Sequence, residues 1–168
     1  DTTGNYNDLP DMKATLTITS ATYDLSGISF DDASYTYDGK EKKLEISGEL
    51  PEGVSVTYSQ NTLVNVGSIE VTASFTSTNP NYNEIEDMKA TLTITKASIE
   101  GISFNGKTVT YNGEEQSIEI SGTLPSGVIV TYSNNNQIEV GTYEVVASFT
   151  DTTGNYNDLP DMKATLTI

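Results

Sequence analysis

The chain of 168 residues is built from one sequence unit that occurs twice, 74 residues apart. The segment Ile28-Ser29-Phe30 returns as Ile102-Ser103-Phe104, with the same spacing. Positions 28–94 and 102–168 align without a gap, and 40 of the 67 aligned pairs are identical. A fixed period of this kind is the signature of tandem domains that contact their neighbours. The sequence therefore predicts two copies of one small domain.

The first 18 residues belong to a third, partial copy, because residues 1–18 are identical, letter for letter, to residues 151–168. We expect the chain to be a piece of a longer array that alternates two repeat types every 150 residues. We divide it into a C-terminal strand fragment of a preceding repeat (1–18), a connector (19–27), repeat 1 (28–95), a second connector (96–101) and repeat 2 (102–168).

Two further expectations concern the segments outside the repeats. Residues 12–18 are expected to be an apolar strand without its own domain, and an unpaired strand is a template for edge pairing. We therefore expect this strand to pair with a free sheet edge or with a neighbouring molecule. The segment 95–101 contains no proline, so we expect it to continue the last strand of repeat 1 into repeat 2 as a stiff joint.

The composition excludes several kinds of function. The chain has 24 acidic and 8 basic residues, a net charge of −16, and no histidine or cysteine. A Cys/His zinc site, a disulfide and a Ser-His-Asp or Cys-His catalytic set are therefore impossible. Nucleic-acid binding and contact of this segment with an anionic membrane are not expected, because both need clustered positive charge. We expect a protein that is not an enzyme.

Apolar and polar residues alternate with a period of two, which is typical of half-buried β-strands. Asp38-Gly39 and Asn112-Gly113 lie between alternating runs and predict a two-residue hairpin with positive φ at both turn residues. We predict about six strands per repeat and no helix, with turns at the spacing of small β-sandwiches. The tyrosines that follow the core phase are expected in the core; these are Tyr37, Tyr58, Tyr111 and Tyr132.

Several spaced motifs resemble a known family. Both copies contain Tyr-Asp/Asn-Gly, then Leu-Pro-x-Gly-Val-x-Val-Thr-Tyr, then Gly-x-x-Glu-Val-x-Ala-Ser-Phe, and they end in Ala-Thr-Leu-Thr-Ile. This pattern is similar to the MBG/YDG-type repeats, which occur in tandem in large bacterial cell-surface proteins. The resemblance covers nearly the whole chain and carries no ligand-binding residues with it.

The resemblance implies a fold, a location and a role. It implies an all-β chain of two tandem small β-sandwich (Ig-like) repeats joined end to end, although the early hairpin departs from a simple Ig order and leaves β-grasp-like repeats open. The expected location is extracellular, at a bacterial cell surface or cell wall. The expected role is a stalk or spacer of an adhesin-like protein, with neighbouring repeats as partners. The alternative is a module that binds a host glycan or host protein by multivalency.

Oxygen-bearing side chains gather near the end of repeat 2, where calcium would find several carboxylate and carbonyl oxygens at once. The candidate calcium ligands are Asp151, Asn155, Asn157, Asp158 and Asp161. A solvated turn is the competing interpretation, because repeat 1 keeps only part of this charge. No other cofactor is expected.

Two other candidate sites use residues that recur in both copies. Tyr82 and Tyr156, with Asn81 and Asn155, lie in an Asn-rich loop and are candidates for contact with a glycan or a protein, against a tyrosine that folds back over the end of the sandwich. Lys89 and Lys163 are candidates for an internal Lys–Asn isopeptide bond, which requires lysine, asparagine and a carboxylate buried together. The competing interpretation is an exposed lysine that discourages edge pairing.

Overall fold

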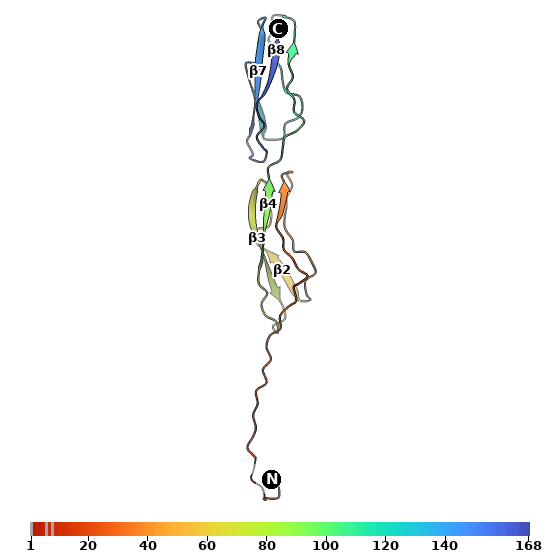
Figure 1. Cartoon of the computed structure of the whole chain (residues 1–168), viewed down its shortest axis with the longest axis vertical. Helices are drawn as coiled ribbons and strands as arrows, with labels where there is room; N and C mark the ends of the chain where they lie inside the picture. The colour runs from red at the N-terminus through yellow and green to blue at the C-terminus, as the bar shows by residue number, and fades with distance from the viewer. Residues whose placement is uncertain (1, 6, 8) are drawn as a thin grey trace.

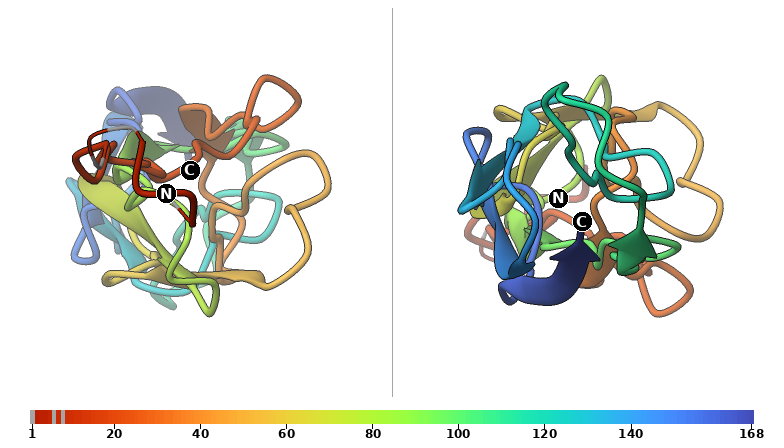
Figure 2. Two further views of the ribbon diagram at one scale, coloured as in Figure 1. Left: turned by 90° about the horizontal axis from the view of Figure 1, so that it is seen from below. Right: turned by 90° about the horizontal axis from the view of Figure 1, so that it is seen from above.

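The structure is a computed structural model that describes residues 2–5, 7 and 9–168, and it shows two β domains joined in line (Figure 1). Seen along the long axis, the two repeats lie one behind the other (Figure 2). The strands of repeat 1 are β1 (Ala33–Thr36), β2 (Val54–Tyr58), β3 (Gly67–Ser77) and β4 (Met88–Thr95). Those of repeat 2 are β5 (Lys107–Thr108), β6 (Val128–Ser133), β7 (Thr142–Asp151) and β8 (Met162–Thr167).

Each repeat contains one four-stranded sheet, in the order β1-β4-β3-β2 or β5-β8-β7-β6. The first and last strands pair in parallel, and the other neighbours are antiparallel. Because side chains alternate between the two faces of a strand, one face of β3 and β4 buries Val71, Ala73 and Leu92 completely. The described residues form no helix, and therefore no membrane-spanning helix.

A second, irregular layer covers the buried face of each sheet. In repeat 1 two isolated antiparallel bridges, Ser29–Ser47 and Lys42–Leu63, tie its segments together, and Phe30 and Leu44 bring it into the core. The order β2-β3-β4 corresponds to strands C, F and G of an immunoglobulin sandwich, and the bridged segments correspond to A, B and E. The prediction of two tandem all-β domains is therefore confirmed, and the connectivity favours the Ig-like alternative over the β-grasp-like one.

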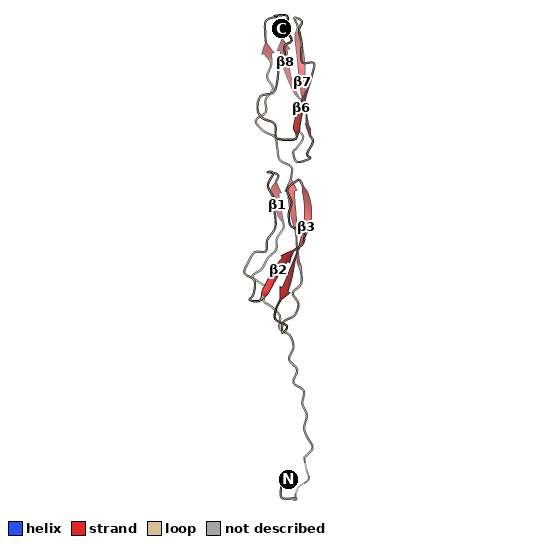
Figure 3. Ribbon diagram, turned by 180° about the vertical axis from the view of Figure 1, so that it is seen from behind, coloured by secondary structure: helices blue, strands red, loops and turns tan. Residues whose placement is uncertain are grey.

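The predicted two-residue hairpin is wrong. The turn at Asp38-Gly39 connects the two layers, since β1 pairs with β4 whereas Lys42 bridges to Leu63. Only the glycine has a positive φ, of 73°, and the Asp38 carboxylate accepts a hydrogen bond from the Lys40 amide at 3.0 Å. The dipeptide specifies a turn, but the hydrogen-bond partners of the flanking arms are decided elsewhere in the chain. Each repeat therefore has four regular strands instead of six (Figure 3).

The tyrosines that the alternation placed on the core face lie in two different environments. The Tyr58 ring packs 5.7 Å from the Phe30 ring, and its hydroxyl accepts a hydrogen bond from the Ile46 amide at 2.9 Å, which joins the two layers. The same contacts recur around Tyr132. The prediction that Tyr37 and Tyr111 are core residues is wrong. Both follow the first strand at the far end of their repeat, where the alternation continues but no second layer covers it.

An asparagine clamp between the layers was not anticipated from the sequence. The Asn61 side chain accepts from the Leu44 amide at 2.8 Å and donates to the Leu44 carbonyl at 2.6 Å. Asn135 makes the same pair of bonds to Ile118. The sequence signal that could have indicated this clamp is the recurrence of Asn61 as Asn135 at the repeat spacing, with no glycine beside either residue.

Residues 12–18, all of which the structure describes, do not pair with an edge of either sheet, so that part of the prediction is wrong. Residues 9–20 are exposed and form no strand, and the side chains of Leu9, Met12, Leu16 and Ile18 are 85–92% exposed. The place for which this sequence is suited, between β5 and β7, is occupied by the identical β8. Pairing with a neighbouring molecule stays a prediction.

Candidate functional site

The two repeats meet at a joint in which the connector itself is hydrogen-bonded. Strand β4 ends at Thr95, and two residues later Ala97 forms a parallel bridge with Tyr156 of repeat 2. The Ala97 amide donates to the Asn155 carbonyl at 3.0 Å, and the Asn157 amide donates to the Ala97 carbonyl at 2.8 Å. The chain thus passes from one sheet into backbone pairing with the next domain, as the proline-free connector predicted.

The side chain of Asn155 links the two repeats. Its oxygen accepts a hydrogen bond from the Val66 amide at 2.9 Å, and its nitrogen donates to the side-chain oxygen of Asn65 at 3.1 Å. Asn155 is only 4% exposed. A buried amide that satisfies a backbone donor in another domain fixes the position of that domain, because leaving either group unpaired costs about 1–3 kcal/mol.

Two tyrosines close the same joint. The rings of Tyr37 in repeat 1 and Tyr156 in repeat 2 meet edge to face, with centroids 5.4 Å apart and an interplanar angle of 85°. Aromatic pairs prefer this geometry, and it contributes about 0.5–1.5 kcal/mol beyond area burial. Burial, followed by the nearby Tyr37 and Asp151, raises the pKa of the Tyr156 hydroxyl.

Asp151 shapes the loop that carries these contacts. Its carboxylate accepts hydrogen bonds from the Thr153 hydroxyl at 2.6 Å, from the Thr153 amide at 2.8 Å and from the Tyr156 amide at 2.9 Å. These bonds, the Thr153 hydroxyl first, lower the pKa of Asp151 from 3.8 to about 2. The loop between β7 and β8 is therefore held in the shape that presents Asn155 and Tyr156 to repeat 1.

Acid is expected to loosen this loop. The folded-state pKa of Asp151 is about 2, below its ordinary value of 3.8, so its stabilising contribution is fully present above about pH 4 and is lost as the pH falls toward 2. We expect the amide resonances of Thr153 and Tyr156 to shift through this window in an NMR titration. Asp151→Asn, which cannot titrate, is expected to abolish that transition; an unchanged transition in the variant would contradict the assignment.

Comparison with known families agrees with this organisation. Residues 26–98 and 101–166 each match the MBG domain, one match per repeat. The chain belongs to the MBG domain family. MBG domains are a non-enzymatic type of repeat domain that occurs in secreted surface proteins. No curated protein matches the chain.

The candidate calcium ligands of the second MBG repeat do not converge. Asp151 and Asn155 use their side-chain oxygens within the protein, as described above. Asn157 donates to the Ser98 hydroxyl at 3.3 Å, Asp158 borders a shallow cavity beside Ile99, and Asp161 is exposed. Among the described residues no three acidic side chains are placed to hold a metal ion. Calcium binding stays a prediction.

The candidate isopeptide lysines of the MBG repeats lie at the surface. Lys89 forms an ion pair with Glu70 at 2.8 Å, and Lys163 forms the equivalent pair with Glu144 at 2.8 Å. All four side chains are 61–62% exposed. An isopeptide bond needs its groups buried together, so this geometry favours the interpretation of a solvated lysine.

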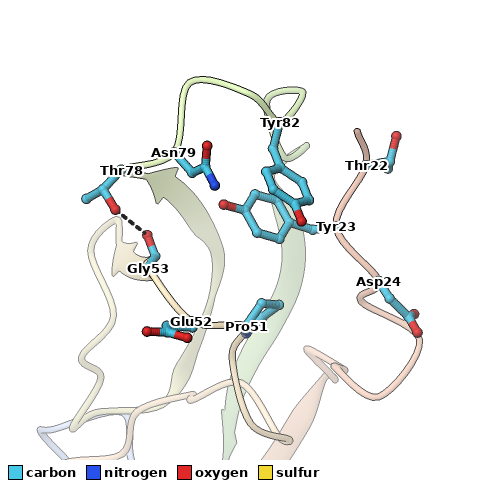
Figure 4. Close-up of a pocket in the computed structure, with 9 residues that line it drawn as sticks. All are labelled: Thr22, Tyr23, Asp24, Pro51, Glu52, Gly53, Thr78, Asn79 and Tyr82. Carbon is cyan, nitrogen blue, oxygen red and sulfur yellow. Dashed lines mark hydrogen bonds between the residues drawn. The ribbon is translucent and has the colours of Figure 1, made fainter. Parts of the chain in front are cut away.

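Tyr82, the counterpart of Tyr156 in the first MBG repeat, folds onto Tyr23 with centroids 4.1 Å apart (Figure 4). The pair lines an open cavity of about 680 Å³ together with Pro51 and Asn79. The side chain of Asn81, next to Tyr82, is exposed and makes no hydrogen bond within the described chain. The sequence had pointed to both Asn-Tyr pairs, but only the structure shows that Asn155 and Tyr156 contact another repeat, on Asn65, Val66 and Tyr37.

Proposed function

We propose that these MBG repeats are non-catalytic stalk or spacer domains of an elongated, adhesin-like protein at a bacterial cell surface or cell wall. The observation that supports this most directly is the joint around Asn155. A connector with only one residue between β4 and its bridge to repeat 2, a buried inter-repeat amide and an edge-to-face tyrosine pair together resist bending. Domains joined in this way add their lengths along one axis.

The charge of the chain is consistent with this function. Its net charge of −16 makes parallel copies repel one another, which keeps long acidic chains soluble and separate. The exposed Lys–Glu pairs on the sheets add little to stability. Folding therefore depends on the small core of each repeat and on its neighbours.

Small-angle X-ray scattering of the chain tests the spacer function. We expect the region of residues 21–168 to scatter as one extended rod, from which residues 9–20 extend. Because the joint is held by hydrogen bonds and ring contacts, the distance between the centres of the two repeats should not change between low salt and about 0.5 M salt. A folded-over particle, or a broad distribution of inter-repeat distances, would contradict the proposal.

The alternative, a multivalent binding module, has less support from the geometry. Among the described residues, the stacked Tyr23–Tyr82 pair beside an open cavity is one aromatic feature that could stack on a sugar. Repeat 2 has Ile99 in the place of Tyr23, so this feature is not shared by both repeats, and Tyr156 is used in the joint. Binding to a host glycan or host protein stays a prediction.

A further inference from the structure

The residues that form the joint have counterparts at the two outer ends of this chain. On the side of repeat 1, the joint uses Tyr37, Asn65 and Val66. At the repeat spacing of 74 residues these positions become Tyr111, Glu139 and Val140 in repeat 2. On the side of repeat 2, the joint uses Asn155 and Tyr156, which become Asn81 and Tyr82 in repeat 1.

The connector that leads into repeat 1 makes the same backbone hydrogen bonds to repeat 1 as the connector of the joint makes to repeat 2. The Ala21 amide donates to the Asn81 carbonyl at 2.9 Å, and the Asn83 amide donates to the Ala21 carbonyl at 2.8 Å. The equivalent bonds of Ala97 to repeat 2 are 3.0 and 2.8 Å long. The last core position of the preceding copy, Ile18, lies three residues before Ala21, as Ile94 lies three residues before Ala97. Up to the bridging alanine, the two connectors therefore have the same length and make the same backbone hydrogen bonds.

The far end of repeat 2 presents an uncovered version of the surface that repeat 1 uses. Tyr111 is 51% exposed and Val140 is 70% exposed, whereas Tyr37 and Val66 are partly buried at the joint. The Val140 amide has no hydrogen-bond partner among the described residues, whereas the Val66 amide donates to Asn155. The amide side chain of Asn81 likewise makes no hydrogen bond among the described residues. An unpaired donor on one end matches an unpaired acceptor on the other.

We propose that Tyr111, Glu139 and Val140 form a docking surface for a second copy of repeat 1, which would present Asn81 and Tyr82. This inference rests on the proposed spacer function and defines the second kind of joint in an alternating array. The Val140 amide would donate to the Asn81 oxygen, and the Asn81 nitrogen would donate to the Glu139 carboxylate in the place of Asn65. A hydrogen bond to a carboxylate is stronger than one to a neutral amide. Tyr82 would turn from Tyr23 toward the edge of Tyr111.

The test is a protein in which residues 1–168 are followed directly by residues 19–98, so that Ile168 continues into Thr19 and a second copy of repeat 1. The core cluster of repeat 1 lies within residues 30–92, so the added copy carries its complete core. Val140 occurs once in this protein, which makes its amide a specific probe. We expect its hydrogen exchange, measured by NMR, to be about tenfold slower than in the 168-residue chain, as expected for one gained hydrogen bond.

Two variants separate this joint from the one already seen. Asn81→Ala in the added copy should return the Val140 amide to fast exchange and leave the Val66 amide of the first repeat 1 protected. Asn155→Ala should speed the exchange of that Val66 amide and leave the Val140 amide protected. If the Val140 amide exchanges equally fast with and without the added repeat, the docking surface does not exist. Scattering of the same protein distinguishes the two proposals, because an extended particle with a fast Val140 amide overturns only the second joint, whereas a compact particle overturns the spacer function.

Discussion

Replacing Leu166 with alanine is expected to unfold repeat 2 at temperatures at which repeat 1 remains folded. The Leu166 side chain is fully buried in the core of repeat 2, and a Leu→Ala change at such a site costs about 2–5 kcal/mol. The core of a domain of this size supplies only about 3–5 kcal/mol of net stability. The loss is therefore comparable with the whole stability of the repeat. Thermal unfolding followed by NMR should show separate transitions for the two repeats.

The chain contains a matched control for this experiment. Leu16 occupies in residues 1–18 the position that Leu166 occupies in the identical residues 151–168, but the Leu16 side chain is 88% exposed. Leu16→Ala is expected to leave both transitions unchanged within about 0.5 kcal/mol, as is usual for surface positions. If the two substitutions have equal effects, the assignment of residues 162–167 to the core strand β8 is wrong.

Replacing Asn155 with alanine is expected to loosen the joint while both repeats stay folded. The substitution removes the acceptor of the Val66 amide and the donor to Asn65, which costs about 1–3 kcal/mol of the free energy that holds the repeats together. Such a cost changes the ratio of docked to undocked molecules by about 5- to 150-fold. Scattering should then show a wider range of inter-repeat distances, and the Val66 amide should exchange faster.

The control for the joint is Asn81→Ala in the 168-residue chain. Asn81 occupies the equivalent position in repeat 1, but its side chain has no partner within the described residues. We therefore expect no change in the shape of the particle or in the exchange of the Val66 amide. Equal loosening by the two substitutions would show that the joint does not depend on the Asn155 side chain.

The local pattern of the sequence predicted which strands form, but not all of their partners. Alternation with a period of two predicted half-buried strands, and it placed Tyr58 and Tyr132 against the core, where they pack, because one face of a half-buried strand must be apolar. It failed at Tyr37 and Tyr111, where alternation continues past the end of the second layer. It also failed at Asp38-Gly39, since a turn dipeptide does not specify whether its flanking arms pair with each other or with two different sheets.

The candidate site was only partly accessible to sequence reasoning. Asn155 and Tyr156 were recognised as candidates for contact because they recur with Asn81 and Tyr82 in a polar loop. The partners of Asn155, which are Asn65 and Val66, lie 90 and 89 residues before it in the chain. No local signal connects such distant positions. The pKa of Asp151 likewise depends on a loop shape that the sequence does not display.

The sequence by itself determined the repeat, the strand period, the exclusion of Cys and His chemistry and the family. Each of these depends on the order of residues within a short stretch or on counting, so no three-dimensional information is needed. Only the tertiary structure decided that the repeats meet through one buried asparagine and two tyrosines, and that Val140, at the matching position of repeat 2, is exposed. Contacts between domains depend on which loops the two folds bring to the same end, and that is a property of the packed chain as a whole.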